Sequence, residues 1–440
     1  MAESIDESFR RKFFLLAVAV ALVNTGFGII FPVFPKLLVQ IGGGNASDLG
    51  NLAAGFGIAF IIGSPIFGNF ADRIGKRRII LFGLLGYSFA NFIYIFATHI
   101  IHLYIARVLE GFFASAILPP AIALTAELSP KENRARYLGL LGASQTTGII
   151  IGPVIGGLLF DGFSLGAIHI AGSLSLPFYA SATMGFLAFS WSYFQLPNSK
   201  IRITESPIAN ETSIKNKFSG TIRHQIRVLP KPLKMFFLFV FTEMLAILAW
   251  LTIEPGFVFY FYDELDLSPT DFGIFVGAFG VVSVLGQSLL GNLSDKFGRK
   301  PVIVIGQAFS FLFYALLLQA TTLLSLILSV LFVGVGSGLR DPALKAWLSD
   351  VTDEENRATV FGIESGLMNT SQVIGPIIGG YLYVISGMTF LFYIAIAINV
   401  VNIFLLSRLW FDEQGDALIV KAKEIVPDQV VESSMMVKGN

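Results

Sequence analysis

The sequence of 440 residues has no cysteine and only four histidines. The missing cysteines exclude disulfides, thiol catalysis and thiolate metal sites, and the four scattered histidines are too few for a histidine metal site. Charged residues make up only 14% of the chain, against roughly 25% in average soluble proteins. Thirty basic and thirty acidic residues cancel, so no net charge attracts a polyanion. This composition argues against a soluble enzyme, a disordered chain and a nucleic-acid binder.

Apolar residues are abundant instead: 54% of the chain is hydrophobic, and the mean hydropathy is +0.72. A helix needs about 20 apolar residues to cross a bilayer. Twelve such stretches predict an all-α membrane protein with 12 transmembrane helices. These stretches are 13–35, 49–71, 79–98, 103–126, 138–160, 173–195, 235–260, 272–293, 302–320, 323–348, 359–383 and 388–410.

Lysine and arginine are distributed unevenly between the loops. If the N-terminus is cytoplasmic, the inner segments hold 26 of the thirty basic residues and the outer loops hold only Lys36. The positive-inside rule then predicts that both termini face the cytoplasm, and we expect a multi-pass protein of the plasma membrane. The predicted parts are an N-terminal half (1–196), a basic cytoplasmic linker (197–234), a C-terminal half (235–410) and a polar cytoplasmic tail (411–440).

The two halves repeat each other at a fixed offset of 223 residues. The segment GNFADRIGKRR begins at Gly68, and GNLSDKFGRK begins at Gly291. The same offset relates Pro153 to Pro376. Duplication of a unit with an even number of helices gives two parallel six-helix halves. Two such halves with a site at their interface are the architecture of an alternating-access transporter.

These features resemble the major facilitator superfamily, and the resemblance covers nearly the whole chain. Within it, the sequence is similar to the drug:proton antiporters, because Arg107 and Gly111 fit a pattern of their fourth helix. Their glycine motif in the fifth helix is matched by Gly139, Gly148, Gly152, Pro153, Gly156 and Gly157. Two residues depart from that branch: Glu110 replaces a usual glutamine, and Asn24 stands where an acid is common. The resemblance implies a two-half fold and proton-coupled efflux.

The glycine motif makes one smooth helix face, which lets a neighbouring helix approach closely. Pro153 removes a backbone donor and bends the helix. The motif therefore has two interpretations that are compatible with each other. It packs helices together, and it forms a seam against the other half that opens and closes.

Charged residues at the inner ends of the helices form two matching groups. The first group contains Asp72, Lys76 and Glu127, and the second contains Asp295, Arg299 and Asp350. We interpret the groups as latches that hold the inner ends of the halves together, because they occur twice at one offset. In the resembled family these residues gate the outward-facing state. The alternative is a set of surface charges that fix topology, each worth ~0–1 kcal/mol.

Charged residues within the spans are the strongest indication of function, since each costs ~2.5–3.5 kcal/mol at mid-bilayer on insertion scales. In the fourth helix, Arg107 and Glu110 are three residues apart and can pair on one face. In such a pair, burial disfavours the charged form of the carboxylate, while attraction to the arginine favours it. This balance suits a group that binds and releases a proton. A static ion pair is the alternative.

The seventh helix holds two acids, Glu243 and Glu254, which share one face with Trp250. Glu254 lies near the outer end, where water can reach it, and Pro255 predicts a discontinuous helix there. Glu243 lies deeper, with no basic residue on its own helix. We therefore prefer Glu243 as the functional acid.

The tenth helix holds Arg340, Asp341 and Lys345. Asp341 and Lys345 are four apart in the favourable order and are predicted to pair. That pairing leaves Arg340 to bind an anion or a carboxylate of another helix, such as Glu364. A buried structural network is the alternative interpretation.

No phosphate-binding loop of the form GxxxxGK followed by Ser or Thr occurs, so ATP is not the expected energy source, and no cofactor or metal is expected. We predict a monomeric transporter that exchanges a small amphiphilic or drug-like molecule for protons across the lipid bilayer. Glu110 and Glu243 are the predicted proton carriers, and Arg107 tunes Glu110. The residues predicted to surround substrate are Asn24, Gln145, Trp250, Arg340, Asp341, Asn369 and Gln372. The rivals are a proton symporter or uniporter for sugars, organic anions or other nutrients, and a non-transporting membrane sensor or scaffold.

Overall fold

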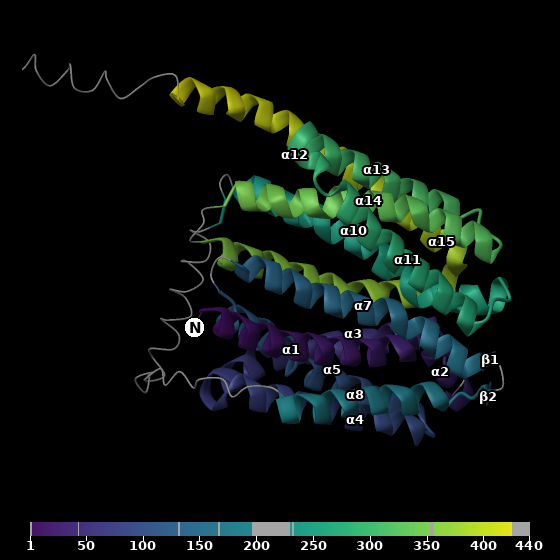
Figure 1. The fold of residues 1–440 in the computed structure, drawn as a ribbon. Helices are drawn as coiled ribbons and strands as arrows, with labels where there is room; N and C mark the ends of the chain where they lie inside the picture. The colour runs from purple at the N-terminus through teal and green to yellow at the C-terminus, as the bar shows by residue number, and fades with distance from the viewer. Residues whose placement is uncertain are drawn as a thin grey trace, which may run out of the picture.

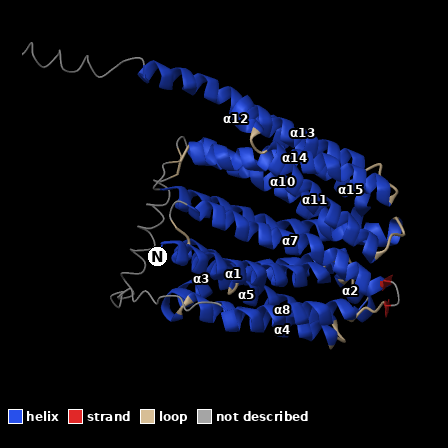
Figure 2. Cartoon of the chain, in the orientation of Figure 1, coloured by secondary structure: helices blue, strands red, loops and turns tan. Residues whose placement is uncertain are grey.

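The computed structural model describes residues 2–42, 44–130, 133–165, 168–195, 229–230, 233–352 and 356–424. Most of these residues are helical, and the long helices lie side by side along one direction (Figures 1 and 2). Most of the predicted linker and the end of the predicted tail lie outside the described residues.

The N-terminal half consists of α1 (Ala2–Ile30), α2 (Phe34–Gly42), α3 (Ala46–Ile74), α4 (Lys76–Ile95), α5 (Ile100–Ser115), α6 (Leu118–Leu128), α7 (Arg134–Asp161), β1 (Gly162–Leu165), β2 (Ile168–Ala171) and α8 (Leu176–Gln195). The C-terminal half consists of α10 (Leu233–Phe259), η2 (Tyr260–Glu264), α11 (Pro269–Leu290), α12 (Leu293–Phe297), α13 (Arg299–Leu317), α14 (Leu323–Asp350) and α15 (Arg357–Glu424).

Ten helical segments in the described ranges are long and apolar enough to cross a membrane. One of them, Thr359–Arg408, contains the last two predicted spans, which meet at Gly387 (φ 75°, ψ 177°). The sixth predicted span corresponds to α8, which has 20 residues. All twelve predicted spans are therefore helical, and the predicted all-α fold is confirmed.

The structure departs from the sequence prediction at four places. The first span, predicted as 13–35, is divided at a turn, because α1 ends at Ile30 and α2 begins at Phe34. The fourth span is divided into α5 and α6, with prolines at the first turn of α6, where a missing N–H costs no helical hydrogen bond. The predicted discontinuity at Pro255 is wrong, because α10 continues through this residue to Phe259 and then widens into the π-helix η2. An antiparallel hairpin, β1–β2, forms a loop for which no strands were predicted.

The internal repeat is visible in the local geometry. Asn45 caps α3 and Ser268 caps α11, each with a capping box at the same 223-residue offset. Gly75 and Gly298, which separate α3 from α4 and α12 from α13, both have a positive φ, 99° and 88°. This conformation favours glycine over any residue with a Cβ. It explains the second glycine in both copies of the repeated loop motif.

The two halves meet mainly along two helix pairs, α7 with α11 and α3 with α15, and α10 also contacts α3. In both main pairs, the backbones of the two helices approach each other closely. A Cβ added at Gly273 of α11 would lie 2.4 Å from the carbonyl oxygen of Pro153 in α7, and one added at Gly50 of α3 would lie 2.1 Å from that of Pro376 in α15. Since no Cβ fits at such distances, glycine is required where the halves touch.

Hydrogen bonds join the halves at the end of the bundle that carries β1–β2, which we call the hairpin end, and three of them lie between described residues. The Tyr262 hydroxyl donates to the carbonyl of Pro32 at 2.5 Å. The Thr270 amide donates to Asp161 at 2.9 Å. A third bond runs from α3 to α15, from Asn51 to the Tyr381 hydroxyl at 3.3 Å. The hairpin end is therefore closed.

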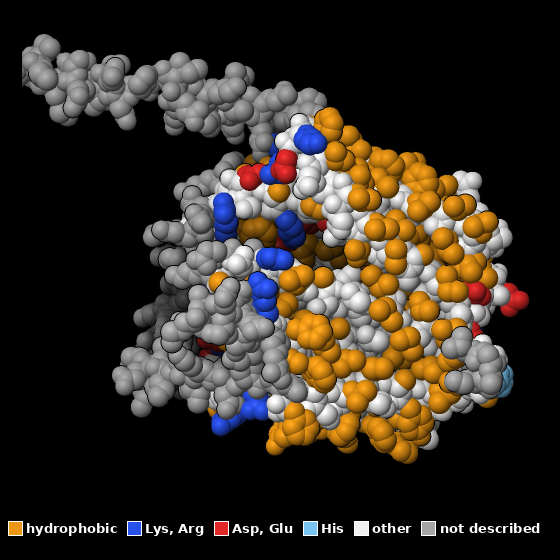
Figure 3. Space-filling view, viewed as in Figure 1, with side chains coloured by type: hydrophobic (Ala, Val, Ile, Leu, Met, Phe, Trp, Pro, Cys, Tyr) orange, Lys and Arg blue, Asp and Glu red, His pale blue; other side chains and the backbone are white. Residues whose placement is uncertain are grey.

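The opposite end carries Lys76 and Arg299, and we call it the basic end. On the faces of α7 and α15 that touch the other half, the contact ceases toward this end. Ile150 of α7 and Val373 of α15 lie on these faces, in contact with the other half. Gly139 and Gly362 lie eleven residues earlier, about three helical turns. A Cβ added at either glycine would meet nothing within 4 Å. Gly142 and Gly366 are equally open. The halves therefore separate toward the basic end, and Figure 3 shows a hollow bordered by Lys and Arg on that part of the surface.

Candidate functional site

The first buried charge cluster lies in the N-terminal half and consists of Tyr94, Arg107 and Glu110, which we call the Arg107 cluster. Arg107 Nη1 donates to Glu110 Oε2 at 2.7 Å, and the Tyr94 hydroxyl donates to the same oxygen at 3.0 Å. Glu110 is 0% exposed, and its Oε1 has no hydrogen-bond partner among the described residues. The guanidinium also lies 5.0–5.5 Å from the ring centres of Phe27, Phe34 and Phe56. The predicted Arg107–Glu110 pair therefore forms in a shielded setting.

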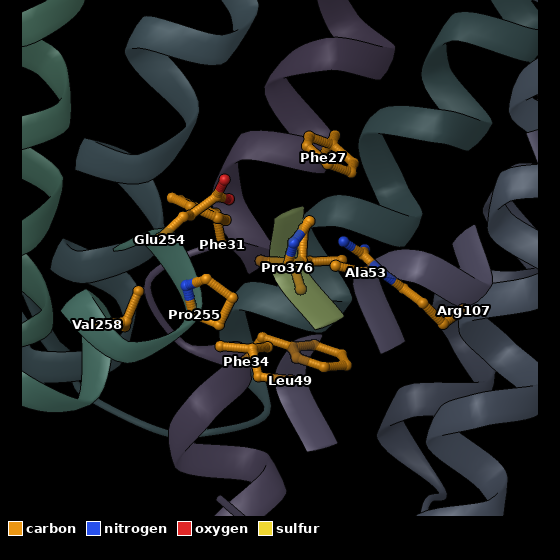
Figure 4. Close-up of a pocket in the computed structure, with 11 residues that line it drawn as sticks. Phe27, Phe31, Phe34, Leu49, Ala53, Arg107, Glu254, Pro255, Val258 and Pro376 are labelled. Atoms are coloured by element: carbon orange, nitrogen blue, oxygen red, sulfur yellow. The ribbon is translucent and has the colours of Figure 1, made fainter. Parts of the chain in front are cut away.

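A small cavity of about 40 Å³ lies between the halves, next to this cluster and toward the hairpin end. Its lining residues are Phe27, Ile30, Phe31, Phe34, Leu49, Ala53, Arg107, Glu254, Pro255, Val258 and Pro376. Figure 4 shows that Arg107 of α5 and Glu254 of α10 extend from opposite sides toward the space between them. Glu254 thus lies near the hairpin end of α10, as its place in the sequence indicates, and it faces the space between the halves and not the outer surface. It forms part of the wall between the halves, and sequence alone indicates no partner for it.

A larger cavity, of about 240 Å³, lies within the C-terminal half, and we call it the C-half cavity. Polar residues of α10, α13, α14 and α15 line much of it. Lys345 Nζ contacts Glu364 Oε1 at 2.6 Å and Glu243 Oε1 at 3.7 Å. The two glutamates are 1% and 9% exposed, whereas the Lys345 side chain is 48% exposed. Glu243 Oε2 and Asn402 Oδ1 have no hydrogen-bond partner within the described part of the chain.

The predicted pairing on α14 is wrong. Arg340, not Lys345, contacts Asp341, at 2.9 Å, and Arg340 also donates to Gln307 at 3.1 Å. Lys345 reaches the acids of α10 and α15 instead. This arrangement is favourable because two almost fully buried carboxylates have more to gain from a cation than the partly exposed Asp341 has. Arg340 is thus already bound within the C-half cavity.

The predicted substrate residues do not form one group. Arg340 and Asp341 line the C-half cavity. Asn24, Gln145, Trp250, Asn369 and Gln372 line neither of the two cavities described above. Asn24 donates back to the Val20 carbonyl of its own helix at 2.8 Å, and Trp250 stacks on Phe279 with ring centres 5.9 Å apart. Both therefore contribute to helix packing in this conformation.

The glycine motif of α7 packs in two directions. Gly148, Gly152 and Gly156 face α1, where added Cβ atoms would lie 2.0–2.6 Å from its backbone. Gly157 faces α11 of the other half, 2.5 Å from Pro269 on the same measure. Both sequence interpretations therefore have a structural counterpart, helix packing within a half and a seam between halves.

The two charge groups at the basic end are assembled as expected from their spacing. Lys76 contacts Asp72 at 3.5 Å and Glu127 at 3.1 Å. Arg299 contacts Asp295 and, at 3.0 Å, Asp350. In the described residues, each of these contacts lies within one half. The structure therefore shows two clusters with matching positions, on opposite sides of the open end.

Several functional candidates were missed by sequence reasoning. Tyr94 completes the Arg107 cluster, and Gln307 bridges Arg340 to Asn399. Asn402, whose Oδ1 has no hydrogen-bond partner among the described residues, also lines the C-half cavity. The signal was present for the amides, because Gln307, Asn399 and Asn402 are polar residues within otherwise apolar spans.

Two six-helix halves that are closed at one end, open at the other and carry buried charges between and within them define the class of alternating-access membrane transporters. The sequence model of the Major Facilitator Superfamily matches residues 16–254 and 239–436. The chain belongs to this superfamily. It is therefore a multi-pass membrane transporter of a small molecule, and not an enzyme.

Curated relatives match almost the full chain. Multidrug resistance protein 2 of Bacillus subtilis (strain 168) is 28% identical over 422 residues, covering 95% of this chain and 99% of that protein. Quinolone resistance protein NorA of Staphylococcus aureus (strain MSSA476) is 28% identical, covering 85% of this chain and 90% of NorA. Tetracycline resistance protein, class H, of Pasteurella multocida is 27% identical, covering 85% and 89%.

Solved structures share the fold at low identity. A bacterial homologue of the human lysosomal transporter Spinster, in an inward-facing and unoccupied conformation, has a TM-score of 0.73 and 16% identity, covering 92% of this chain and 98% of that one. The human organic anion transporter MFSD10 (TETRAN) has a TM-score of 0.66 and 15% identity, covering 90% and 99%.

Proposed function

We propose that this protein exports a small amphiphilic, drug-like molecule in exchange for protons. The observation that carries the proposal is the set of buried carboxylates, Glu110, Glu243 and Glu364, each beside a single cation that it contacts or shares. A carboxylate in such a position is suited to binding and releasing a proton, because neutralisation removes the cost of a buried charge. The similarity to multidrug, quinolone and tetracycline resistance proteins supports efflux as the direction.

The orientation we propose places the basic end and both termini in the cytoplasm of a plasma-membrane protein, because 26 of thirty basic residues lie on that side. The described conformation is then inward-facing, with the hairpin end closed. Substrate enters from the cytoplasm between the halves and leaves at the hairpin end after the halves rock. A monomer suffices for this cycle, because both halves are parts of one chain.

Glu110 and Glu243 are the proton carriers in this proposal, and Arg107 and Lys345 are their counter-cations. Substrate occupies the space between the halves and extends toward the C-half cavity, where Asp341 and Glu243 face inward. Asn24, Gln145, Trp250, Asn369 and Gln372 contribute to the site in conformations other than the present one. The clusters of Asp72 and Asp295 gate the basic end.

The test is a pH jump in proteoliposomes that hold the purified protein. An imposed gradient should drive a quinolone or a lipophilic dye against the flow of protons, with no accumulation in protein-free vesicles. Movement of the solute with the protons would replace the proposal by symport. Absence of flux for all cations, anions and sugars screened would favour a sensor or scaffold.

A further inference from the structure

The pocket between the halves contains an acid that the proton-carrier proposal does not use. Glu254 lies opposite Arg107 across a cavity of about 40 Å³ (Figure 4). Among the described residues, no hydrogen bond or ion pair joins Glu254 to another side chain. Arg107 Nε is likewise buried, and it has no hydrogen-bond partner in the part of the chain that the structure describes. The carboxylate of Glu254, an acceptor in the C-terminal half, therefore faces Arg107, whose guanidinium is a donor in the N-terminal half.

The charges in this pocket do not balance when all three groups are ionised. Glu110 and Glu254 supply two negative charges and Arg107 supplies one positive charge. The remaining titratable groups that face the cluster are the hydroxyls of Tyr87 and Tyr94 on α4, while α1, α3 and α15 line the pocket only with apolar side chains. One proton on either glutamate makes the trio neutral. If the proton binds Glu110, Glu254 supplies the one carboxylate left to Arg107 among the described residues that line the pocket.

The positions of Arg107 and Glu254 link a contact between them to the conformational change of the transporter. Arg107 belongs to the N-terminal half and Glu254 to the C-terminal half, and their pocket lies just inside the closed hairpin end. Attraction between them therefore draws the halves together at this end. The cavity between them has room for about three waters, so a modest approach brings the two head groups into contact.

We propose that Glu254 is the partner on the opposite half that Arg107 binds when Glu110 takes up a proton, so that proton binding closes the hairpin end. The inference rests on the proposed proton coupling and makes Glu254 a positioning residue. This proposal gives the order of steps that exchange of substrate for protons requires. The proton-loaded protein returns to the inward-facing state, and Arg107 binds Glu110 again after the proton has been released. The contact between Arg107 and Glu110 at 2.7 Å then marks the state after proton release.

The test uses the cysteine-free background of the chain. Val258 lines the pocket and is 1% exposed, so a Val258→Cys thiol is protected while the hairpin end is closed. An impermeant thiol reagent is applied from the outer side at one fixed pH, without substrate. Glu254→Gln should increase the reaction rate at least about fivefold, the size of an ordinary coupling free energy. Glu254→Asp, which keeps the charge, should leave the thiol largely protected.

The matched control is Glu264→Gln, which removes an exposed acid of η2 outside the pocket and should leave the rate unchanged. Glu110→Gln imitates the protonated acid, and in that background Glu254→Gln should have a larger effect than in the parent. Equal effects in the two backgrounds, or no effect of Glu254→Gln, would overturn the proposal. Because the assay needs neither substrate nor a gradient, it judges the pair even if the transport test fails.

Discussion

At the scale of single residues, two glutamates compete for the role of principal proton carrier. Glu110 is fully buried and holds Arg107 and Tyr94 on one oxygen. Glu243 shares Lys345 with Glu364, and its Oε2 has no hydrogen-bond partner within the described ranges. The two sites lie in different halves, so their effects on transport are separable.

We expect Glu110→Gln to abolish proton-driven accumulation while substrate exchange at equal pH continues. The amide keeps the shape and still accepts hydrogen bonds from Arg107 and Tyr94, but it does not titrate. Both activities are measured in the same proteoliposomes. If Glu110→Gln still accumulates substrate under a pH gradient while Glu243→Gln does not, the proton is carried by the C-terminal half and Glu110 only holds Arg107.

Arg340→Ala should lower the free energy of unfolding by about 1–3 kcal/mol, because Gln307 and Asp341 lose a charged hydrogen-bond donor in the C-half cavity. Thermal unfolding of the purified protein measures this, and Arg408→Ala, an exposed arginine on α15, is the control. An unchanged melting temperature together with lost binding of an anionic substrate would instead make Arg340 a ligand for that substrate.

At the scale of helices, small residues set how closely the elements approach. α7 contains both a tight and an open glycine, and this allows a matched comparison within one helix. A Cβ at Gly152 would lie 2.6 Å from the Cα of Gly28 in α1, whereas one at Gly142 would meet nothing within 4 Å. Packing, and not helix propensity, therefore distinguishes the two positions.

Gly152→Ala should destabilise the protein by the typical cost of overpacking, about 1–3 kcal/mol, and should lower the yield of folded protein. Gly142→Ala should be neutral or slightly stabilising, because alanine favours the helix. Melting temperatures in one detergent compare the two variants. Equal stability would mean that α1 and α7 separate easily, and the close approach would then have no structural importance.

Sequence patterns predicted the elements better than the contacts between side chains. Span length and the 223-residue repeat depend only on hydropathy and spacing, and they predicted all twelve helical spans. Partner choice on α14 depends on which acids are more deeply buried, so the Asp341–Lys345 pair was predicted wrongly. The place of Glu254 opposite Arg107 could not be predicted for a related reason, since their pocket forms only when both halves are assembled.

At the scale of the whole molecule, the two halves lean together at the hairpin end and apart at the basic end. Hydrogen bonds between halves occur at the first end, and open glycine faces occur at the second. The Asp72 and Asp295 clusters lie on opposite sides of this opening. In an outward-facing state the basic end must close. Each cluster then approaches the helix of the other half against which its own half packs, α15 for the Asp72 cluster and α7 for the Asp295 cluster. The charges of the clusters then affect the relative stability of the inward-facing and outward-facing states.

Asp72→Asn combined with Asp295→Asn should shift the protein toward the inward-facing state, because each change weakens a cluster that holds the basic ends together when they meet. A cysteine at Gly142, on the open face of α7, reports this state. In inside-out vesicles its reaction with an impermeant thiol reagent should be faster in the double variant than in the parent. A Val258→Cys thiol at the hairpin end should become better protected in the same variant, and substrate binding should be largely retained. Since the two reporters lie at opposite ends, a general loosening of the fold would make both react faster. Equal reactivity of Gly142→Cys in variant and parent would show that the clusters only fix topology, and that the basic end closes without them.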